Sequence, residues 1–561
     1  MSDKKNNVTL EEYENSFSYK KSKTNLNIEF NRIAFIFFIF LIISIIYSIQ
    51  LLHLGSLKKT ENNIKTPITK KNYRADIIDR NGNYLVKTVD SINVGIHPAK
   101  VINKKHLLLM LNHIYKNENL SKIKKKLDGD RFFYLEKNIR PKRYEELMML
   151  GDKSISSEAS LVRLYPQKNL FSHIIGQIDN DNNGISGIEK SFDEELKKRN
   201  KPLKLTVDLD IQFLIRRELL RFQNIFEARG SAAILMNVNS GEILSMVSLP
   251  DFNLNKRETI KDVNYINKIT KGTYELGSVF KTFTIASGIN EGLIEPDTKF
   301  LDSKKSISCG KKHNIEEYDN KMPSDLTVEQ ILIKSGNIGS VRIVRKVGIE
   351  KHKSFLQTIG ILNKIDFDID EVGKPQSIDW YEGCKLETIA FGHGITTTIL
   401  QLAKGYSIIT NGGYDIKPTI IKTDLDKKHK KVKVLKNDVS KKMNAMLRKV
   451  VSEGTAKLVN VKGYQVGGKT GTADQVVNSI YSNIKINTLA SVFPTDNPKY
   501  VLVLMLESTK NNKDYVYEYR DGSGFKLKGS PRNTAGWTSV EAAGKIIDKI
   551  GPILATKYIE N

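Results

Sequence analysis

A long stretch without any charge dominates the N-terminal part of this sequence. From Ile33 to Ile49 it reads IAFIFFIFLIISIIYSI, and three leucines up to position 54 extend it to a length that can cross a bilayer. A helix buried in a soluble core would show polar breaks at helical spacing, whereas only two serines interrupt this stretch. The sequence therefore predicts a single N-terminal transmembrane helix over residues 32–54.

The polar segment 1–31 precedes the predicted helix. The apolar part of a signal peptide normally starts much closer to the N-terminus, so we expect an anchor that is not cleaved. Basic residues flank both ends of the helix, and their distribution does not decide on which side of the membrane the tail lies. They are Lys20, Lys21, Lys23 and Arg32 before it, and Lys58, Lys59, Lys70 and Lys71 after it.

The composition excludes several classes of protein. A hydrophobic fraction of 40% over 561 residues suffices for two folded units besides the anchor. The formal charge is +25, but no basic stripe is interleaved with aromatic residues, so no nucleic acid partner is predicted. Cys309 and Cys384 are too few for a disulfide framework, and they can pair or stay free. Cys309 lies near His313 without a second such pair, so neither a metal nor a cofactor is expected.

The region after the anchor predicts a scaffold or partner-binding domain. The segment Arg74–Leu85 reads RADIIDRNGNYL, in which Asn81-Gly82 suits a turn with positive φ between two strands. Lysine-rich helical stretches and short extended pieces follow, and no catalytic grouping of residues accompanies them. The expected helices cover 106–115 and 144–150, and the expected strand covers 161–164.

The rest of the chain predicts an α+β domain that begins near residues 201–205. Residues 205–212 lead into an amphipathic helix, and an amphipathic helix over 540–550 closes the chain. A long, mostly helical middle separates the first two strands from the last three, so we expect one mainly antiparallel sheet covered by helices. The predicted strands are 232–238, 242–248, 466–473, 489–493 and 500–506.

The first chemical motif is Ser278 followed by Lys281, a spacing that places a hydroxyl and an amine on one face of a helix start. The same S-x-x-K spacing occurs at seven other serines in this lysine-rich chain, so the spacing alone is weak. However, Gly277 permits a tight turn before Ser278, and the apolar segment Phe283–Ile289 can bury the helix. A serine becomes a nucleophile when a neighbour takes its proton, which a lysine can do as the free amine.

A second motif, Ser335-Gly336-Asn337, follows an apolar periodic run. Helix capping or a loop would explain these residues without any chemistry. The functional interpretation gives Ser335 a proton relay, and it makes Asn337 the residue that holds a substrate amide and the lysine in place.

The third motif, Lys469-Thr470-Gly471, occurs once in the chain and is followed by Thr472. A strand with a glycine bulge would explain Gly471 but not the residues around it. On an edge strand, a small residue lets a substrate peptide pair with the backbone. In this interpretation Lys469 attracts a carboxylate, and Thr470 and Thr472 offer hydroxyl groups to it.

These three motifs, in this order, resemble the penicillin-binding protein and serine β-lactamase superfamily. The anchor, the segment Arg74–Leu85, the segment Gly184–Leu196 and the missing N-terminal glycosyltransferase unit resemble class B penicillin-binding proteins. The segments VGGKTGTA at 466–473 and TAGWTSVEAAGKII at 534–547 look most like the septal transpeptidase of Gram-negative cell division.

The resemblance implies a fold and a division into domains. It implies a mixed α/β pedestal domain and a transpeptidase domain whose five-stranded antiparallel sheet is flanked by helices. The expected parts are a cytoplasmic tail (1–31), the transmembrane helix (32–54), a pedestal for dimerisation or partner binding (55–204) and the transpeptidase domain (205–561).

The resemblance also implies a reaction. Ser278 would be acylated by the penultimate D-Ala of a peptidoglycan stem peptide, and an amine of a neighbouring stem peptide would then release the enzyme. The backbone N–H groups of Ser278 and Thr472 would hold the oxyanion, while Lys281, Ser335 and Lys469 would pass protons. β-Lactams would act as covalent inhibitors. A mobile loop over 509–532 is expected near the site. The stretch Phe391–Gly394 resembles a family segment, in which His393 is structural and not a general base.

The implied substrate lies outside the cytoplasmic membrane, so the N-terminus would be cytoplasmic and the catalytic domain periplasmic, at the division septum. The implied partners are division-complex proteins, among them a lipid-linked glycan polymerase. The alternatives are an elongation-type transpeptidase, a β-lactamase, a β-lactam sensor and a catalytically silent division scaffold.

Overall fold

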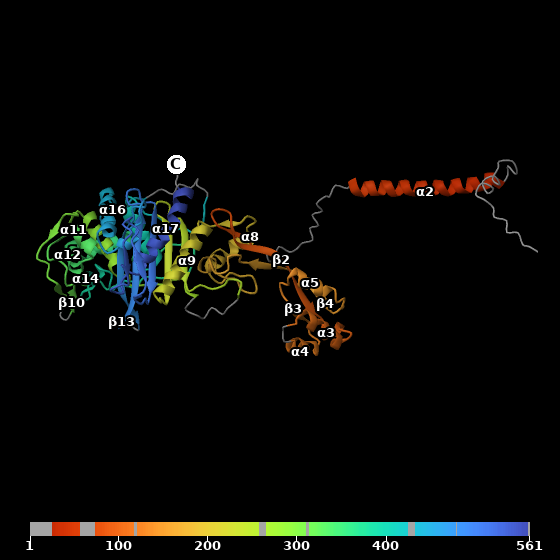
Figure 1. The fold of residues 1–561 in the computed structure, drawn as a ribbon, viewed down its shortest axis with the longest axis horizontal. Coiled ribbons are helices and arrows are strands. Elements are labelled where there is room, and N and C mark those ends of the chain that lie inside the picture. The colour runs from red at the N-terminus through yellow and green to blue at the C-terminus, as the bar shows by residue number, and fades with distance from the viewer. Residues whose placement is uncertain are drawn as a thin grey trace, which may run out of the picture. The chain divides into compact units, whose positions relative to one another are not determined.

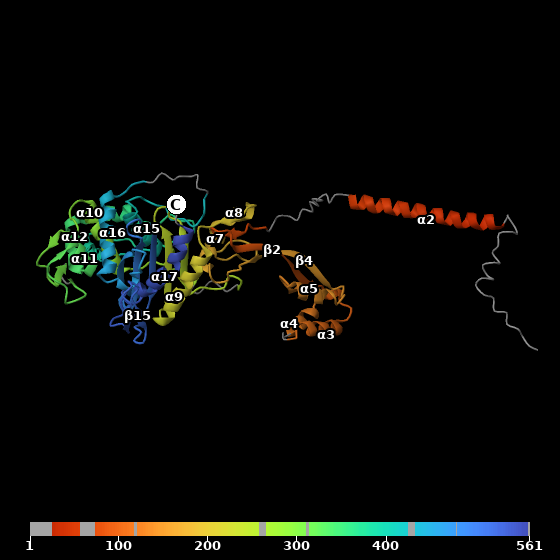
Figure 2. The same ribbon diagram turned by 45° about the horizontal axis from the view of Figure 1, so that its top comes forward.

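The structure is a computed structural model that describes residues 25–56, 73–116, 120–256, 265–309, 313–423, 432–477 and 480–558. It forms two compact units, Met1–Lys71 and Asn72–Asn561, which are drawn in Figures 1 and 2. Most of the expected cytoplasmic tail, residues 1–24, lies outside the described residues.

The first unit contains the helix α2, Asn25–Ser56. Its segment Ala34–His53 has a mean hydropathy of 2.6, and none of it is buried within the protein, which suits a helix that crosses a membrane. The helix begins seven residues before the predicted start because backbone hydrogen bonding continues through the polar residues that precede the apolar stretch.

The second unit opens with a sheet in the order β3-β2-β1-β5, in which β4 also pairs with β2. The predicted turn after β1 is present, with Gly82 at a φ of 92°, and the Asp79 carboxylate accepts the backbone N–H groups of Asn81 and Asn83 at 2.8 Å. The strands are β1 (Ile77–Ile78), β2 (Tyr84–Ile96), β3 (Phe133–Glu136), β4 (Ile155–Leu164) and β5 (Leu203–Lys204).

This N-terminal region has two hydrophobic cores. The far half of β2 packs with three helices around its own core, which includes Val94, Leu107 and Leu147. The near half of β2 belongs to the large core that it shares with the C-terminal part of the chain. The three helices are α3 (Lys104–Ile114), α4 (Ser121–Leu127) and α5 (Pro141–Met148), and a short 3-10 turn, η2 (Pro98–Lys100), precedes them.

A buried ion pair joins the two N-terminal segments that resemble class B proteins. Nε of Arg74 lies 2.5 Å from Oε2 of Glu189, and both side chains are fully buried. Arg163 pairs with the other oxygen of Glu189 at 2.9 Å, which compensates for the cost of burying the charges. Glu189 lies on the second of three short helices, α6 (Ser172–Ile175), α7 (Gly187–Ser191) and α8 (Asp193–Lys198).

The C-terminal sheet has five antiparallel strands in the order β12-β13-β14-β6-β7, which confirms the predicted fold. The strand β12 therefore forms one edge. The strand β13 is longer than predicted, because its first half alternates apolar and polar residues only in part. The bounds are β6 (Gly230–Asn237), β7 (Ile243–Leu249), β12 (Gly467–Val477), β13 (Ile480–Phe493) and β14 (Tyr500–Glu507).

Helices cover this sheet on both sides, as Figures 1 and 2 show. The predicted helices α9 (Leu209–Ile225) and α17 (Ser539–Lys557) contact each other and the sheet. On the other side α15 (Ile399–Thr410) and α16 (Asn437–Ser452) pack together and contact the sheet. The layers thus enclose the central strands and leave β12 at the margin.

The middle of the chain supplies further helices, of which η4 contacts the β12 edge. They are η4 (Gly277–Phe280), α10 (Lys281–Asn290), α11 (Val328–Lys334), α12 (Asn337–Val347), α13 (Ile349–Thr358), α14 (Lys385–Ile389) and η5 (Lys457–Val459). Short strand pairs accompany them: β8 (Lys299–Phe300) with β11 (Leu326–Thr327), and β9 (Ser306–Cys309) with β10 (His313–Glu316).

Cys309 and Cys384 form a disulfide, which answers the question that the sequence leaves open. The segment expected to be a mobile loop, 509–532, contains a hairpin of β15 (Val516–Glu518) and β16 (Lys526–Lys528). Tyr517 of this hairpin is fully buried in the large core. Apolar packing therefore attaches the hairpin to the domain. The lysine-rich sequence of the hairpin does not predict this packing.

The expected domain boundary at residues 204 and 205 is compatible with the pairing of strands there. Lys204 pairs with Ile78 in the N-terminal sheet, whereas the N–H of Thr206 donates to the carbonyl of Ile420 in the C-terminal part. The shared core nevertheless makes one compact unit of residues 72–561.

Candidate active site

Ser278 lies in a turn that the backbone of β12 approaches closely. Gly277 has a φ of 63°, and a Cβ atom at this position would lie 2.7 Å from the carbonyl oxygen of Thr472. Only glycine meets both demands at low cost. Ser278 is half-buried and its hydroxyl has no hydrogen-bond partner among the described residues. Its backbone N–H is in the first turn of a helical segment, where N–H groups lack an intrahelical acceptor.

Gly471 allows the same close packing from the opposite side. A Cβ atom on Gly471 would lie 2.2 Å from the carbonyl oxygen of Leu276. Gly471 stays in register with Thr488, and the irregularity in the strand comes later, between Asp474 and Val476. The glycine therefore allows the close contact between β12 and η4 and is not part of a bulge. Its expected role in binding a substrate strand stays a prediction.

Ser335 ends the helix α11 in a left-handed conformation, with a φ of 59°. This conformation is uncommon for a residue other than glycine, and it turns both the carbonyl and the hydroxyl of Ser335 toward Lys281. Nζ of Lys281 lies 2.5 Å from the Ser335 carbonyl oxygen and 3.2 Å from Ser335 Oγ. Asn337, the first residue of α12, places Oδ1 2.7 Å from the same Nζ.

The three acceptors around Lys281 match the three donors of an ammonium group. Lys281 is fully buried, and burial lowers its pKa from 10.5 to about 7, although the negative charge of Glu317 opposes this shift. The ammonium and the free amine are thus both accessible near neutral pH. Of the three contacts, the Ser335 hydroxyl is the one that can reverse and donate when Lys281 loses a proton.

Lys469 approaches the same hydroxyl from β12. Its Nζ donates to Ser335 Oγ at 2.9 Å and to the Thr470 carbonyl oxygen at 3.1 Å, and the side chain is fully buried. Burial, and in addition the positive charge of Lys281, holds the pKa of Lys469 well below 10.5. Two buried amines therefore share one hydroxyl, which connects them as a proton relay requires.

The hydroxyl groups of the two threonines are engaged within the protein. Thr470 Oγ1 lies 2.8 Å from Thr455 Oγ1. Thr472 Oγ1 donates to Asn487 Oδ1 at 3.1 Å and accepts the N–H of Ala535 at 3.0 Å. A bound substrate would have to compete with these contacts, so the substrate-binding role expected for both threonines stays a prediction.

A polar network connects this edge to the segment that follows β14. The Asn487 amide donates to Thr509 Oγ1 at 2.7 Å and to Asn533 Oδ1 at 3.0 Å. Sequence analysis missed Asn487 and Asn533, since lone asparagines in a strand and a loop carry no pattern that marks them.

The segment with His393 also packs on the serine turn. A Cβ atom on Gly392 would lie 2.1 Å from the Gly277 carbonyl oxygen, and the N–H of Gly394 donates to Glu275 Oε1 at 3.1 Å. Tyr481 donates to the other oxygen of Glu275 at 3.2 Å. Burial raises the pKa of Glu275 and lowers that of His393. The structural role expected for His393 is compatible with this packing.

Sequence analysis also missed Glu317. Its carboxylate accepts the N–H groups of Asn337 at 2.8 Å and Ile338 at 2.9 Å. A glutamate in a loop, 18 residues before the motif that begins at Ser335, carries no local signal of this contact.

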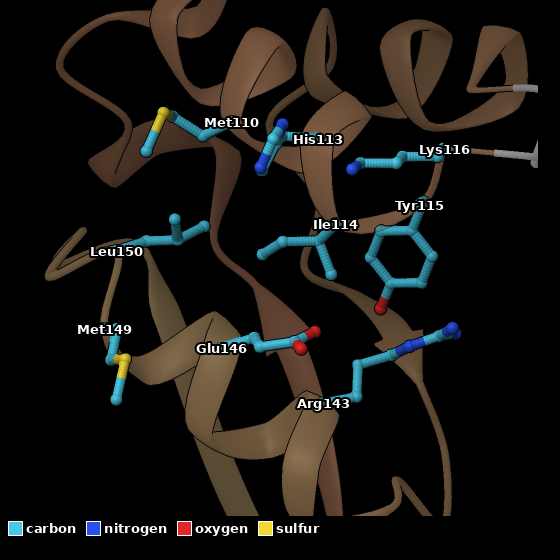
Figure 3. Close-up of a pocket in the computed structure, with 9 residues that line it drawn as sticks. All are labelled: Met110, His113, Ile114, Tyr115, Lys116, Arg143, Glu146, Met149 and Leu150. Atoms are coloured by element: carbon cyan, nitrogen blue, oxygen red, sulfur yellow. The ribbon is translucent and has the colours of Figure 1, made fainter.

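A pocket of the N-terminal region lies apart from the motif residues. It has a volume of about 510 Å³ and lies between α3 and α5 (Figure 3), where Ile114, Tyr115 and Arg143 line it. None of the motif residues contributes to it. Hydrogen bonding and burial mark the candidate site.

Comparisons with known proteins agree with this arrangement. Residues 231–521 match the penicillin binding protein transpeptidase domain, and residues 69–210 match the penicillin-binding protein dimerisation domain. A probable peptidoglycan D,D-transpeptidase FtsI from Caulobacter vibrioides is 26% identical over 499 residues, which cover 86% of this chain and 82% of that protein. Stage V sporulation protein D from Bacillus subtilis is 27% identical over 495 residues, covering 78% and 74% respectively.

A solved structure shares the fold. The apo form of penicillin binding protein 3 from Mycobacterium tuberculosis superposes with a TM-score of 0.64 at 22% identity, and the match covers 87% of this chain and 96% of that one.

The contact at Gly471 generates a prediction. We expect Gly471→Ala to lower the free energy of unfolding by roughly 1–3 kcal/mol, as overpacking does, because the methyl group would push β12 away from η4. Thermal unfolding of the full chain measures the effect. Gly129→Ala is the matched control, since its Cβ atom would meet nothing closer than 3.7 Å. Equal melting temperatures for the two variants would contradict the prediction.

Proposed function

Because the chain belongs to the penicillin-binding protein family, as a class B member with a dimerisation domain and a transpeptidase domain, we propose that it cross-links peptidoglycan through an acyl-enzyme on Ser278. The relative from Caulobacter vibrioides carries the name of a peptidoglycan D,D-transpeptidase. The observation that carries the proposed mechanism is the Ser335 hydroxyl, which two buried amines share at 3.2 and 2.9 Å.

In the first half of the reaction, Lys281 as the free amine takes the proton of the Ser278 hydroxyl. The Ser278 oxygen attacks the carbonyl carbon of the penultimate D-Ala, and a tetrahedral oxyanion forms. The N–H of Ser278 and the N–H of Thr472 on the edge strand are the proposed donors to it, and removal of one such donor typically costs about 3–4 kcal/mol of transition-state stabilisation.

The peptide bond then breaks, and the leaving amine of the terminal D-Ala receives a proton. Lys281 holds that proton, and Ser335 with Lys469 provides a path for it. In the second half, an amine of a neighbouring stem peptide attacks the Ser278 ester and gives up a proton by the same path. The ester C–O bond breaks, Ser278 regains its hydrogen, and a new amide links the two strands.

Lys469 also has a proposed role in binding the substrate carboxylate. In the free protein, burial disfavours its ammonium form. A carboxylate bound beside it would stabilise that form again, so Lys469 would gain its charge together with the substrate. Thr470, Gly471 and Thr472 would line the same strand edge, where backbone groups of β12 are not all paired with β13.

Covalent labelling tests the nucleophile. We expect a fluorescent penicillin to label the full-length protein, and Ser278→Ala to abolish the label while the melting temperature stays within a few degrees of the wild type. Ser377→Ala, at an exposed serine, is the control and keeps the label. Persistent labelling of the Ser278→Ala protein would refute the assignment of the nucleophile.

Mass spectrometry of the same samples separates a transpeptidase from the alternatives. A transpeptidase retains the penicillin adduct on Ser278, whereas a β-lactamase hydrolyses it quickly. A wild-type protein that neither carries an adduct nor consumes the penicillin would favour a silent scaffold.

The pKa of Lys281 generates a prediction about pH. Because the free amine is the active base and its pKa is about 7, we expect the acylation rate to rise with pH through about 7 and to be lost progressively below it. An exposed lysine would place the same rise near 10.5. Measuring the rate constant of penicillin labelling across pH decides between the two, and a rise confined to alkaline pH would contradict the buried-amine mechanism.

We also propose a septal role, a cytoplasmic N-terminus and a periplasmic catalytic domain. The segments at 466–473 and 534–547 support the septal role, and the apolar helix α2 supports a single membrane anchor. The proposed partners are division-complex proteins, among them a lipid-linked glycan polymerase.

A fluorescent fusion to the N-terminus tests the septal role in dividing cells. We expect the signal to gather at mid-cell, because the proposed substrate is cross-linked there during division. A signal spread evenly along the side wall would instead support the elongation-type alternative. A fusion that carries Ser278→Ala is the control, since it shows whether placement depends on catalysis.

A further inference from the structure

The side chain of Asn337 is oriented by the hairpin β9–β10. Its Nδ2 donates to the carbonyl oxygen of Glu316 at 2.8 Å. This contact leaves Oδ1 to accept from Lys281, at 2.7 Å. An amide group has a donor end and an acceptor end. The carbonyl of Glu316 in the hairpin accepts from the nitrogen, so the oxygen is the end that faces Lys281.

The backbone of Asn337 is held from the same hairpin. The carboxylate of Glu317, the residue after β10, accepts the N–H groups of Asn337 and Ile338 at 2.8 and 2.9 Å. These groups begin the helix α12 and have no acceptor within the helix. A carboxylate is also favoured at this end by the helix dipole. Two oxygens of one side chain thus fix the start of α12.

The hairpin itself is anchored on two sides. The disulfide joins Cys309 of β9 to Cys384, directly before α14. A small core, separate from the two larger ones, packs Cys309 and Ile315 of the hairpin against Ile338 and Val341 of α12. Glu317 is therefore presented to Asn337 by a structure that has little freedom to move away.

Glu317 also differs in charge from the other groups that face Lys281. These are Lys469 from β12 and His393 from the segment after α14, and among the described residues Glu317 is the acid whose charge acts on Lys281. Glu317 forms no ion pair with Lys281 in the described chain, so its charge acts across Asn337 rather than through direct contact.

We propose that Glu317 is a positioning residue of the acylation reaction, which holds Asn337 against Lys281 and helps to set the balance between the amine and ammonium forms of Lys281. The proposal depends on the function proposed above. Glu317 does not touch the reacting atoms. Its two effects are separable, because the hydrogen bonds determine how fast the fully active form reacts, whereas the charge determines at which pH that form appears.

The test measures the rate constant of labelling by a fluorescent penicillin against pH, with full-length protein. We expect Glu317→Gln to shift the midpoint of the acid limb to lower pH, because removing the negative charge lowers the pKa of Lys281 further. The plateau rate should also fall, because the amide has one acceptor oxygen for two N–H groups. Glu317→Asp keeps the charge, so its midpoint should stay while its shorter side chain lowers the plateau.

Glu316→Gln is the matched control. It removes the same charge from the neighbouring residue, but the Glu316 side chain is exposed and the site uses only its backbone carbonyl. Both the midpoint and the plateau should match the wild type.

The outcomes separate the two proposals. A wild type that is not labelled overturns the proposed function and this role with it. A labelled wild type with an unmoved Glu317→Gln midpoint overturns the role of Glu317 alone. If the Gln variant does not fold, the Asp variant decides: a full plateau overturns the positioning role, and a reduced plateau at the wild-type midpoint supports it.

Discussion

Two amines buried around one hydroxyl define this structure. Water cannot reach Nζ of Lys281 or Lys469, so each ammonium form loses solvation, and the two also repel each other. Such a pair exists only where rigid surroundings hold it together. The turn before α10, the end of α11 and the edge strand β12 come from distant parts of the chain and meet at Ser335. Glycines at positions 277 and 471 let the backbones of the turn and of β12 touch. The compact domain around them supplies the rigidity.

Much of the site could be predicted from the sequence, because each motif carries a local signal. The start of a helix is sufficient to place the serine and lysine of the first motif on one face. The apolar sequences of β6 and β14 predict the central sheet. Prediction from the sequence failed where contacts between distant residues determine the local structure. The first half of β13 alternates apolar and polar residues only in part, and the hairpin with Tyr517 lies in a lysine-rich segment. The pairing of Cys309 with Cys384 depends on residues 75 apart in sequence.

Residues of the third motif also have structural contacts that the sequence does not predict. The missing side chain of Gly471 makes room for the turn that carries Ser278. The hydroxyl of Thr472 joins β12 to Asn487 and Ala535. The predicted roles of both residues in substrate binding stay predictions. The role of Glu317 could not be foreseen, because its contact with α12 exists only once the hairpin has folded against it. A motif thus predicts which residues belong to the candidate site, whereas the contacts of each residue depend on the folded structure.

The strand β2 belongs to two cores at once. Its near half packs in the large core with the catalytic part, and its far half packs with α3 and α5, while β4 accompanies it over ten paired positions. The strands of such a ribbon are already close to their full extension. The distal core is therefore joined to the large core through extended, hydrogen-bonded backbone, so a pull on one core is carried to the other along these two strands.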